Sequence, residues 1–214
     1  GRSHFTYNHS MSRKIINYIG LFMLLVVLPG MSWVYLSSGL AYQKAKRAEL
    51  QRLGSVPAFP YLLMNGDTIG AEELGGKLLL AFDFAGQPDS GAAVAFRELE
   101  KIHRQFDERK DVIFLLLGSP SDSAALADWM DKYSLEDPGQ VYAVVRPGSA
   151  NGDFGIGANG ARTSTVAVAD SAGIIRQYYD FRDGNRVRRS VEHIAILMPF
   201  RDRDEAVLRR EKEK

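Results

Sequence analysis

The segment 82–91 has the residue types and the position of a chemically active corner. Phe82-Asp83-Phe84 ends an apolar run and Gly91 directly precedes an amphipathic one (92–106), so we expect a strand to pass into a helix here. The first turn of a helix carries partial positive charge, which lowers the pKa of a thiol placed there. The 214-residue chain contains no cysteine, however. Disulfides, thiol redox chemistry and thiolate metal sites are therefore excluded, and the corner is expected to keep its shape without that chemistry.

The other side chains that could do chemistry are scattered along the sequence. His4 and His9 lie near the start, and His103 and His193 fall in separate predicted helices. They lack metal-ligand spacing, so we expect them at the surface or at helix ends. The segment 155–160 spells Gly-x-Gly-x-x-Gly, but a dinucleotide fingerprint needs a strand before it and a helix after it, and neither is predicted here. We predict no catalytic residue, metal, cofactor or small-molecule substrate.

The surrounding sequence predicts the elements that would position this corner. Continuous apolar runs favour strands buried on both faces, and apolar residues three and four apart favour helices packed against the sheet. A short hairpin is expected around Asn65-Gly66. The expected strands and helices after it are strands 78–84, 112–117, 141–145, 163–168 and 174–179 and helices 92–106, 123–133 and 187–198. This order predicts an α/β fold: a mixed β-sheet with helices on both faces.

Composition and periodicity predict a globular core after residue 55. The chain is 45% hydrophobic and 25% charged, close to the globular average. Its formal net charge of +1 gives no reason to expect a nucleic acid partner. The helix residues expected to face the core are Val94, Leu99, Ile102, Phe106, Leu126, Trp129, Met130, Val191, Ile194, Ala195 and Met198.

An uncharged run from 15 to 43 precedes this core. At 1.5 Å per residue it is long enough to cross a hydrocarbon layer of about 30 Å. Trp33 and two tyrosines lie toward its far end, as in an interfacial belt. A single transmembrane helix is therefore predicted, with a kink at Pro29-Gly30. A cleaved signal peptide is the alternative, and the length of the apolar part argues against it.

The chain is thus expected to have five parts. They are an N-terminal tail (1–14), the transmembrane helix (15–43), a linker helix (44–55), the globular domain (56–200) and a charged tail (201–214). Lysine and arginine flank both ends of the membrane run, so the charge count leaves the orientation open. Small residues in the run, Gly20 and Gly30 among them, would let a partner helix pack closely.

Over roughly 56–198 the sequence resembles the Sco/SenC family of thioredoxin-like copper chaperones. The family motifs that it shares are an opening Pro-x-Phe, a Gly-Lys before the central strand, Phe-x-Phe before the metal loop, and a hairpin glycine followed by Tyr-Tyr. Here these are Pro57 with Phe59, Gly76-Lys77, Phe82-Asp83-Phe84, Gly173 and Tyr178-Tyr179. The resemblance implies a thioredoxin-like fold, and the N-terminal membrane anchor agrees with it.

The departures from the family pattern fall on all three copper ligands. By the resemblance, Gln87 and Gly91 stand in place of the two cysteines and Arg162 in place of the histidine. Such copper sites need soft thiolates and imidazole, and a guanidinium would repel a cation. Pro88 and Asp89 remain as good helix-start residues. For Asp83 two interpretations stay open: an ion pair with Arg162 across the altered site, or exposure to solvent at the sheet edge.

The resemblance implies a location and a kind of partner complex for this chain, but no reaction that it would catalyse. We expect a single-pass, non-catalytic structural subunit or assembly factor of a membrane complex, with a respiratory host linked to cytochrome oxidase. Its partners would be the lipid bilayer and other membrane subunits, with the domain outside (periplasm or intermembrane space) and the N-terminus inside. The alternative is a copper chaperone with non-standard Met, His and Asp ligands. The residues expected to contact a partner are Gln87, Pro88, Asp89, Ser90, Gly20, Gly30 and Trp33.

Overall fold

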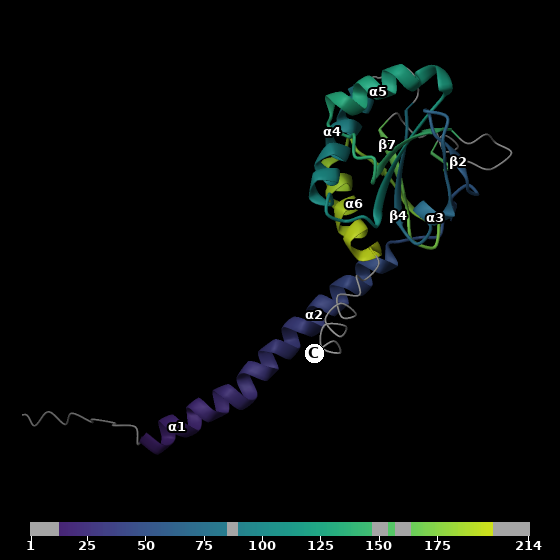
Figure 1. Cartoon of the computed structure of the whole chain (residues 1–214). Coiled ribbons are helices and arrows are strands. Elements are labelled where there is room, and N and C mark those ends of the chain that lie inside the picture. The colour runs from purple at the N-terminus through teal and green to yellow at the C-terminus, as the bar shows by residue number, and fades with distance from the viewer. Residues whose placement is uncertain (1–12, 85–89, 147–153, 157–163, 199–214) are drawn as a thin grey trace, which may run out of the picture. The chain divides into compact units, whose positions relative to one another are not determined.

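A computed structural model describes residues 13–84, 90–146, 154–156 and 164–198 of the chain. The two tails and three loop segments lie outside the described residues and are drawn as a grey trace in Figure 1. The chain divides into two compact units, Gly1–Ala48 and Glu49–Lys214. The first contains the predicted membrane segment, and the second contains the globular domain.

The first unit is one long helix with a wider turn inside it. It consists of α1 (Arg13–Phe22), a π-helical turn η1 (Met23–Val27) and α2 (Leu28–Ala48). Pro29 has no amide hydrogen, and a proline ring clashes with the carbonyl four residues before it. The Leu28 N–H bonds to the Met23 carbonyl, five residues back, which is the π-helical pattern. The expected kink at Pro29-Gly30 is therefore accommodated as a π turn on the N-terminal side of the proline.

This helix is long and apolar enough to cross a membrane, as predicted. The stretch Ile16–Ala48 has 33 residues. None of the residues in its most apolar 18-residue segment is buried inside the protein. The prediction of a linker helix over 44–55 is wrong beyond Ala48. Instead, the Gln51 and Leu53 amides bond to β8 carbonyls, and β1 (Gly54–Ser55) pairs antiparallel with β8 (Ile174–Asp180). The linker thus forms the edge of the sheet.

The domain is built on a six-stranded mixed sheet in the order β1-β8-β7-β4-β5-β6. Its centre is parallel: β4 (Leu78–Asp83), β5 (Val112–Gly118) and β6 (Val141–Val145). β7 (Thr165–Ala169) runs antiparallel to β4 and forms a hairpin with β8. Every residue of β5 is buried, as a continuous apolar run predicts. The predicted mixed sheet and thioredoxin-like strand arrangement are confirmed.

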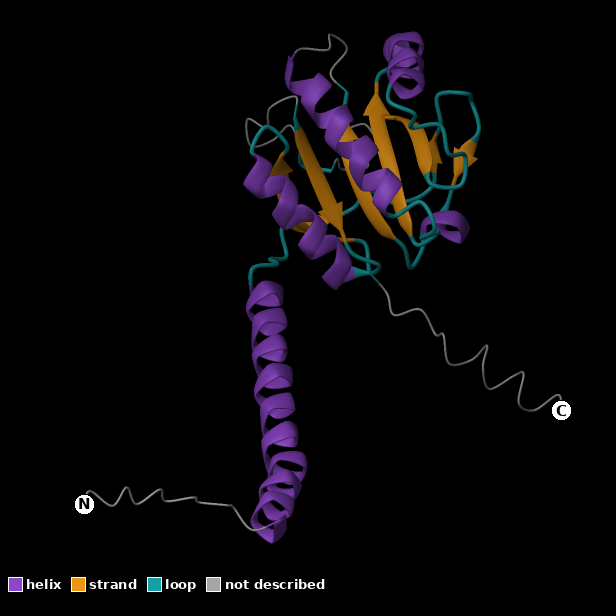
Figure 2. Ribbon diagram, turned by 90° about the vertical axis from the view of Figure 1, so that its left-hand side faces the viewer, coloured by secondary structure: helices purple, strands orange, loops and turns teal. Residues whose placement is uncertain are grey.

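The two faces of the sheet are covered differently (Figures 1 and 2). One face packs against all three long helices: α4 (Ser90–Gln105), α5 (Ser123–Lys132) and α6 (Gly184–Leu197). The other packs against the short helix α3 (Ala71–Leu74), the β2–β3 hairpin and Phe154. Helices therefore lie on both faces, as predicted, but within the described part of the chain the helix on the second face is a single turn.

Turns follow the sequence signals closely. β2 (Tyr61–Leu62) and β3 (Thr68–Ile69) form the hairpin expected around Asn65-Gly66, and Gly66 has φ +92°. A 3₁₀ turn, η2 (Pro120–Asp122), leads into α5. The α6 helix starts three residues before the predicted position because the Asp183 carboxylate accepts the Asn185 amide hydrogen and caps it.

The inward faces of the helices were predicted only in part. In α4 the small residues Ala92 and Ala95 are buried with Phe96, Leu99 and Ile102, whereas Val94 is half-exposed. Leu126 is the fully buried residue of α5, and Trp129 and Met130 are half-exposed. In α6, Ile194 is buried but Ala195 is exposed. Periodicity identified the apolar side of each helix but not which residues of that side lie nearest to the sheet.

Two histidines expected at the surface are buried. The His103 ring packs against Phe114. His193 is completely buried, and its Nδ1 lies 2.5 Å from the Tyr179 hydroxyl on β8. The other ring nitrogen, Nε2, lies 3.5 Å from the Glu49 carboxylate, so α6 contacts the first residue after the membrane helix. Burial also raises the pKa of Tyr179, which keeps its hydroxyl protonated over the physiological pH range.

Replacing Tyr179 by phenylalanine is expected to destabilise the domain by about 1–3 kcal/mol, because the buried His193 nitrogen loses its hydroxyl partner. Tyr142→Phe on β6 is the matched control, since that hydroxyl is bonded to no described residue, and its cost should stay within about 0.5 kcal/mol. Denaturant unfolding of both variants measures the difference. Equal stability in the two would show that the hydroxyl–imidazole contact contributes nothing.

Candidate functional site

The corner predicted from the sequence lies between the end of β4 and the start of α4. β4 ends at Asp83, and α4 begins at Ser90 with an exposed side chain. Gln87, Pro88 and Asp89 lie outside the described residues, so their expected partner contacts stay predictions. The two sides of the corner are described, and both carry an arginine that the sequence analysis did not single out.

The first of these arginines covers Gly91. A Cβ atom added at Gly91 would lie 2.7 Å from Nε and 2.8 Å from Cζ of Arg182, far inside normal contact distance. Arg182 belongs to the turn between β8 and α6. The position that resemblance assigns to the second cysteine therefore has no side chain, and a guanidinium fills the space beside it. Because neither group can donate electrons to a metal, this side of the corner does not fit a copper ion.

The second arginine pairs with Asp83. Nε and Nη2 of Arg146 lie 2.9 and 2.5 Å from one Asp83 carboxylate oxygen, and Nη2 also donates to the Phe84 carbonyl. The two side chains are 39% and 23% exposed, so the pair contributes at most about 1 kcal/mol. Arg162 lies outside the described residues, and its predicted pairing with Asp83 stays untested. Asp83 is nonetheless neither unpaired nor directed only to solvent.

Strand order explains why Asp83 meets Arg146. β4 and β6 flank β5 in parallel, so the carboxyl ends of all three strands lie at the same edge. Asp83 ends β4 and Arg146 directly follows β6, so both charged residues lie at this edge. The sequence contained this signal, because both charged residues terminate predicted parallel strands. A comparison of the ends of those strands would have found the pair.

A second carboxylate lies near Arg146. Hydrogen bonds from the Ser119 hydroxyl and amide, and then the positive charge of Arg146, hold the pKa of Asp122 below its usual value. Asp122 thereby closes the η2 turn that follows β5. Arg146 thus interacts with the charges of both Asp83 and Asp122, and the two carboxylates outnumber the single guanidinium on this side of the corner.

Aromatic side chains support the corner from the helical face of the sheet. The Phe96 ring lies 5.4 Å from Phe82, 6.0 Å from Phe84 and 5.1 Å from Trp129. Trp129 is half-exposed, and the Lys132 ammonium lies 5.3 Å from the centre of its ring. The corner thus rests on a buried aromatic cluster from which Trp129 reaches the surface, and tryptophan is enriched in protein interfaces.

The remaining candidate residues lie on the membrane helix. Trp33 is 74% exposed, and a Cβ placed on Gly20 or Gly30 would meet nothing within 4 Å. All three are therefore open to lipid or to a partner helix, as the expectation requires. These three residues belong to the first unit of the chain and the corner belongs to the second.

Comparison with known proteins supports the fold. No family model and no curated protein matches the chain. A solved SCO1/SenC family lipoprotein from Bacillus anthracis str. Ames is similar in structure, with 16% identity, coverage of 67% of this chain and 94% of that chain, and a TM-score of 0.51.

Two further solved structures show the same likeness. A putative protein disulfide isomerase from Bacteroides thetaiotaomicron has 14% identity, coverage of 70% and 91%, and a TM-score of 0.53. A putative electron transfer protein from Aquifex aeolicus VF5 has 16% identity, coverage of 67% and 96%, and a TM-score of 0.51. At these identities the likeness establishes the thioredoxin-like fold, and a SCO1/SenC protein is among the structures that share it, as the motifs predicted.

Proposed function

We propose that this chain is a membrane-anchored, non-catalytic Sco-like protein that acts by contact with other membrane subunits. The observation that carries the proposal is the filled corner: a guanidinium lies over Gly91, where resemblance places a metal-binding thiol. The fold resembles that of a protein described as a putative disulfide isomerase, yet this chain has no cysteine with which to exchange a disulfide. A retained scaffold without its reactive groups is best used as a binding surface.

The proposed setting is a respiratory complex linked to cytochrome oxidase, where the chain serves as a permanent subunit or an assembly factor. The support is the SCO1/SenC structural neighbour together with the shared motifs at Pro57, Gly76-Lys77 and Tyr178-Tyr179. The helix Ile16–Ala48 supplies the anchor, and we place the domain on the outer side of the membrane. Protease added after the outer membrane alone has been opened checks that side: cleavage of the domain only once the inner membrane is also lysed would contradict it.

Photocrosslinking tests the proposed contact surface. Benzoylphenylalanine at Ser90, which is exposed beside the corner, should crosslink to a membrane subunit in native membranes. The same group at Lys101 is the matched control, because Lys101 lies on the same helix with 62% side-chain exposure but away from the corner. A discrete adduct at position 90, absent at 101, is expected. If neither position gives an adduct, or if both give equal amounts, the proposal that the corner is the contact surface is contradicted.

Copper titration separates this proposal from its metal-binding alternative. Calorimetry of the full chain in detergent should detect no stoichiometric Cu(I) site tighter than about 1 µM, a limit that corresponds to roughly 8 kcal/mol of binding free energy. Tight one-to-one binding would support a chaperone with non-standard ligands and contradict action by contact alone.

A further inference from the structure

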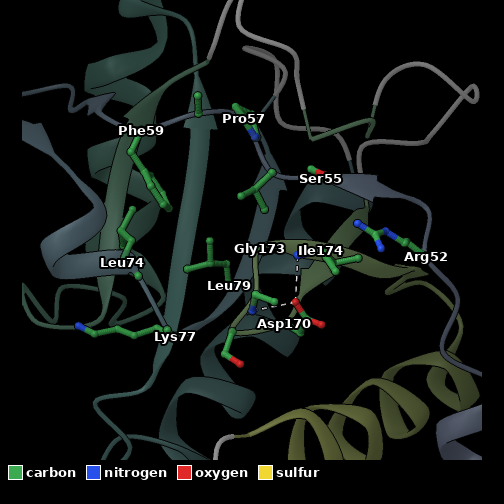
Figure 3. A pocket seen from close by; sticks show the side chains of 16 residues that line it. Arg52, Ser55, Pro57, Phe59, Leu74, Lys77, Leu79, Asp170, Gly173 and Ile174 are labelled. Carbon is green, nitrogen blue, oxygen red and sulfur yellow. Dashed lines mark hydrogen bonds between the residues drawn. The ribbon is translucent and has the colours of Figure 1, made fainter.

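A cavity on the far side of the domain from the corner has no role in the proposed function. It has a volume of about 410 Å³ and lies at the opposite end of β4. Three segments enclose it: the extended stretch after β1, the turn from α3 into β4, and the turn between β7 and β8 (Figure 3). All of these belong to the second unit of the chain. Its size falls in the range of small-ligand sites.

The floor of this cavity is apolar. Leu74 and Leu79 are almost fully buried beneath it, and Phe59, Val56 and Ile174 form its sides. Figure 3 shows the Phe59 ring and the Leu74 and Leu79 side chains on the same side of the opening. A ligand that fits such a floor must carry an apolar body, because the floor offers no hydrogen-bonding side chain to a polar one.

One cation is directed at the opening. The Arg52 side chain extends toward the cavity near Ser55 and Ile174, whereas Lys77 extends away from it on the opposite side (Figure 3). Arg52 forms no ion pair with any described residue. The charge of Lys77 instead faces Glu73 on α3. Arg52 is therefore the positive charge that a bound ligand would meet.

The acidic residue in the lining does not cancel Arg52. One Asp170 carboxylate oxygen accepts the amide hydrogens of Ala172 and Ile174 at 3.0 and 2.9 Å. The other accepts from the Arg176 guanidinium, with Nε at 2.7 Å. Asp170 is 7% exposed, so its charge is compensated inside the β7–β8 turn. The opening consequently keeps a net positive character.

We infer that this cavity binds a medium-chain acyl carboxylate, with the carboxylate on Arg52 and the hydrocarbon chain over Leu74, Leu79 and Phe59. A guanidinium matches the planar fork of a carboxylate, and a single cation balances a single negative charge. At about 30 Å³ for each non-hydrogen atom, the share that liquid water occupies, the volume holds roughly a dozen such atoms. Octanoate fits that limit. The inference is independent of the proposed action at the corner.

Photoaffinity labelling of the full chain in phosphatidylcholine nanodiscs tests the inference. The probe is octanoate with a diazirine at its chain end, and mass spectrometry maps the labelled peptides. Saturable labelling is expected on the lining segments 56–59, 74–79 and 170–174, reduced about tenfold in Arg52→Gln. Lys77→Gln is the matched control, because it removes a neighbouring positive charge that points away, and it should leave labelling unchanged.

The corresponding diazirine-bearing octanol separates charge recognition from simple partitioning. In the unmodified chain the alcohol should label the lining at least tenfold less than the carboxylate does. Replacing Arg52 by glutamine should leave the labelling by the alcohol unchanged. Equal labelling by alcohol and carboxylate, equal labelling of the unmodified chain and Arg52→Gln, or an unlabelled lining would each overturn the assignment. Crosslinking from Ser90 is unaffected by any of these results, so the two proposals fail separately.

Discussion

A cysteine introduced at position 91 is expected to have a thiol pKa at least about one unit below the ordinary value of about 8.5. Two features of the corner favour the thiolate. Gly91 is the second residue of α4, where the helix dipole stabilises negative charge. The Arg182 guanidinium lies directly over the position, and it must move aside but remain adjacent when a side chain is added. At pH 7 the thiolate fraction should rise from about 3% to more than about a fifth.

Burial of the introduced thiol opposes this lowering of its pKa, but the effect is too small to reverse it. Position 91 is buried, which favours the neutral thiol, but the Arg182 guanidinium over it belongs to an exposed residue, so we expect desolvation to raise the thiol pKa by less than the two favourable charges lower it. The flexible end of an exposed arginine can also shift at low cost, so the Gly91→Cys variant should fold. Because the chain has no other cysteine, the difference in ultraviolet absorbance between the variant and the unmodified chain during a pH titration reports the thiolate of this residue and cancels the contribution of the nine tyrosines.

Two further variants isolate the cause. In Lys101→Cys the thiol lies on an exposed turn in the middle of the same helix and should titrate near the ordinary value of about 8.5. Combining Gly91→Cys with Arg182→Gln should return part of the shift, because only the helix dipole then remains. If the thiol in Gly91→Cys titrates at or above the pKa of the thiol in Lys101→Cys, the corner does not stabilise negative charge.

The guanidinium over Gly91 could not be predicted from the sequence. Arg182 follows β8, which reaches the corner only because β7 pairs antiparallel with β4 and places the end of the hairpin beside the start of α4. An arginine in a turn next to Asp183 has no local feature that distinguishes it from other surface arginines. The sequence shows the glycine at position 91, but it does not show that the Arg182 side chain occupies the space beside it.

The sheet, by contrast, followed from local patterns. The strands predicted within the domain are present, and β5 is buried along its full length as its continuous apolar run predicts. The linker shows where local pattern fails: residues 50–53 have reasonable helix propensity, but backbone bonds to β8 at Gln51 and Leu53 stabilise an extended conformation instead. Tertiary pairing outweighs a propensity of a few tenths of a kcal/mol per residue.

Buried histidines show a similar limit. His193 falls on the opposite side of α6 from the predicted apolar stripe that includes Val191 and Ala195, and a polar residue is assigned to the surface unless a partner is known. Its partner, Tyr179, is on β8 and its second neighbour, Glu49, comes from the start of the domain. Each residue was visible in the sequence, and only the fold brings the three together.

Replacing Phe96 by alanine should produce the largest loss of stability among the changes considered, about 3–5 kcal/mol. Phe96 is completely buried, and its ring contacts those of Phe82, Phe84, Trp129 and Tyr133. Two of these neighbours lie in or directly after the central strand β4, and the other two lie in or directly after the helix α5. Because the strand and the helix are separate elements, the four rings cannot all move inward to fill the cavity that the missing Phe96 ring would leave.

Guanidinium unfolding followed by tryptophan fluorescence measures this loss, since Trp129 lies against Phe96. Leu62→Ala is the control, because that side chain is 47% exposed and its removal should cost no more than about 1 kcal/mol. A Phe96→Ala loss no larger than that of Leu62→Ala would mean that the ring cluster collapses freely. In that case the corner would rest on a deformable base, and a contact surface fixed by the aromatic cluster would no longer be tenable.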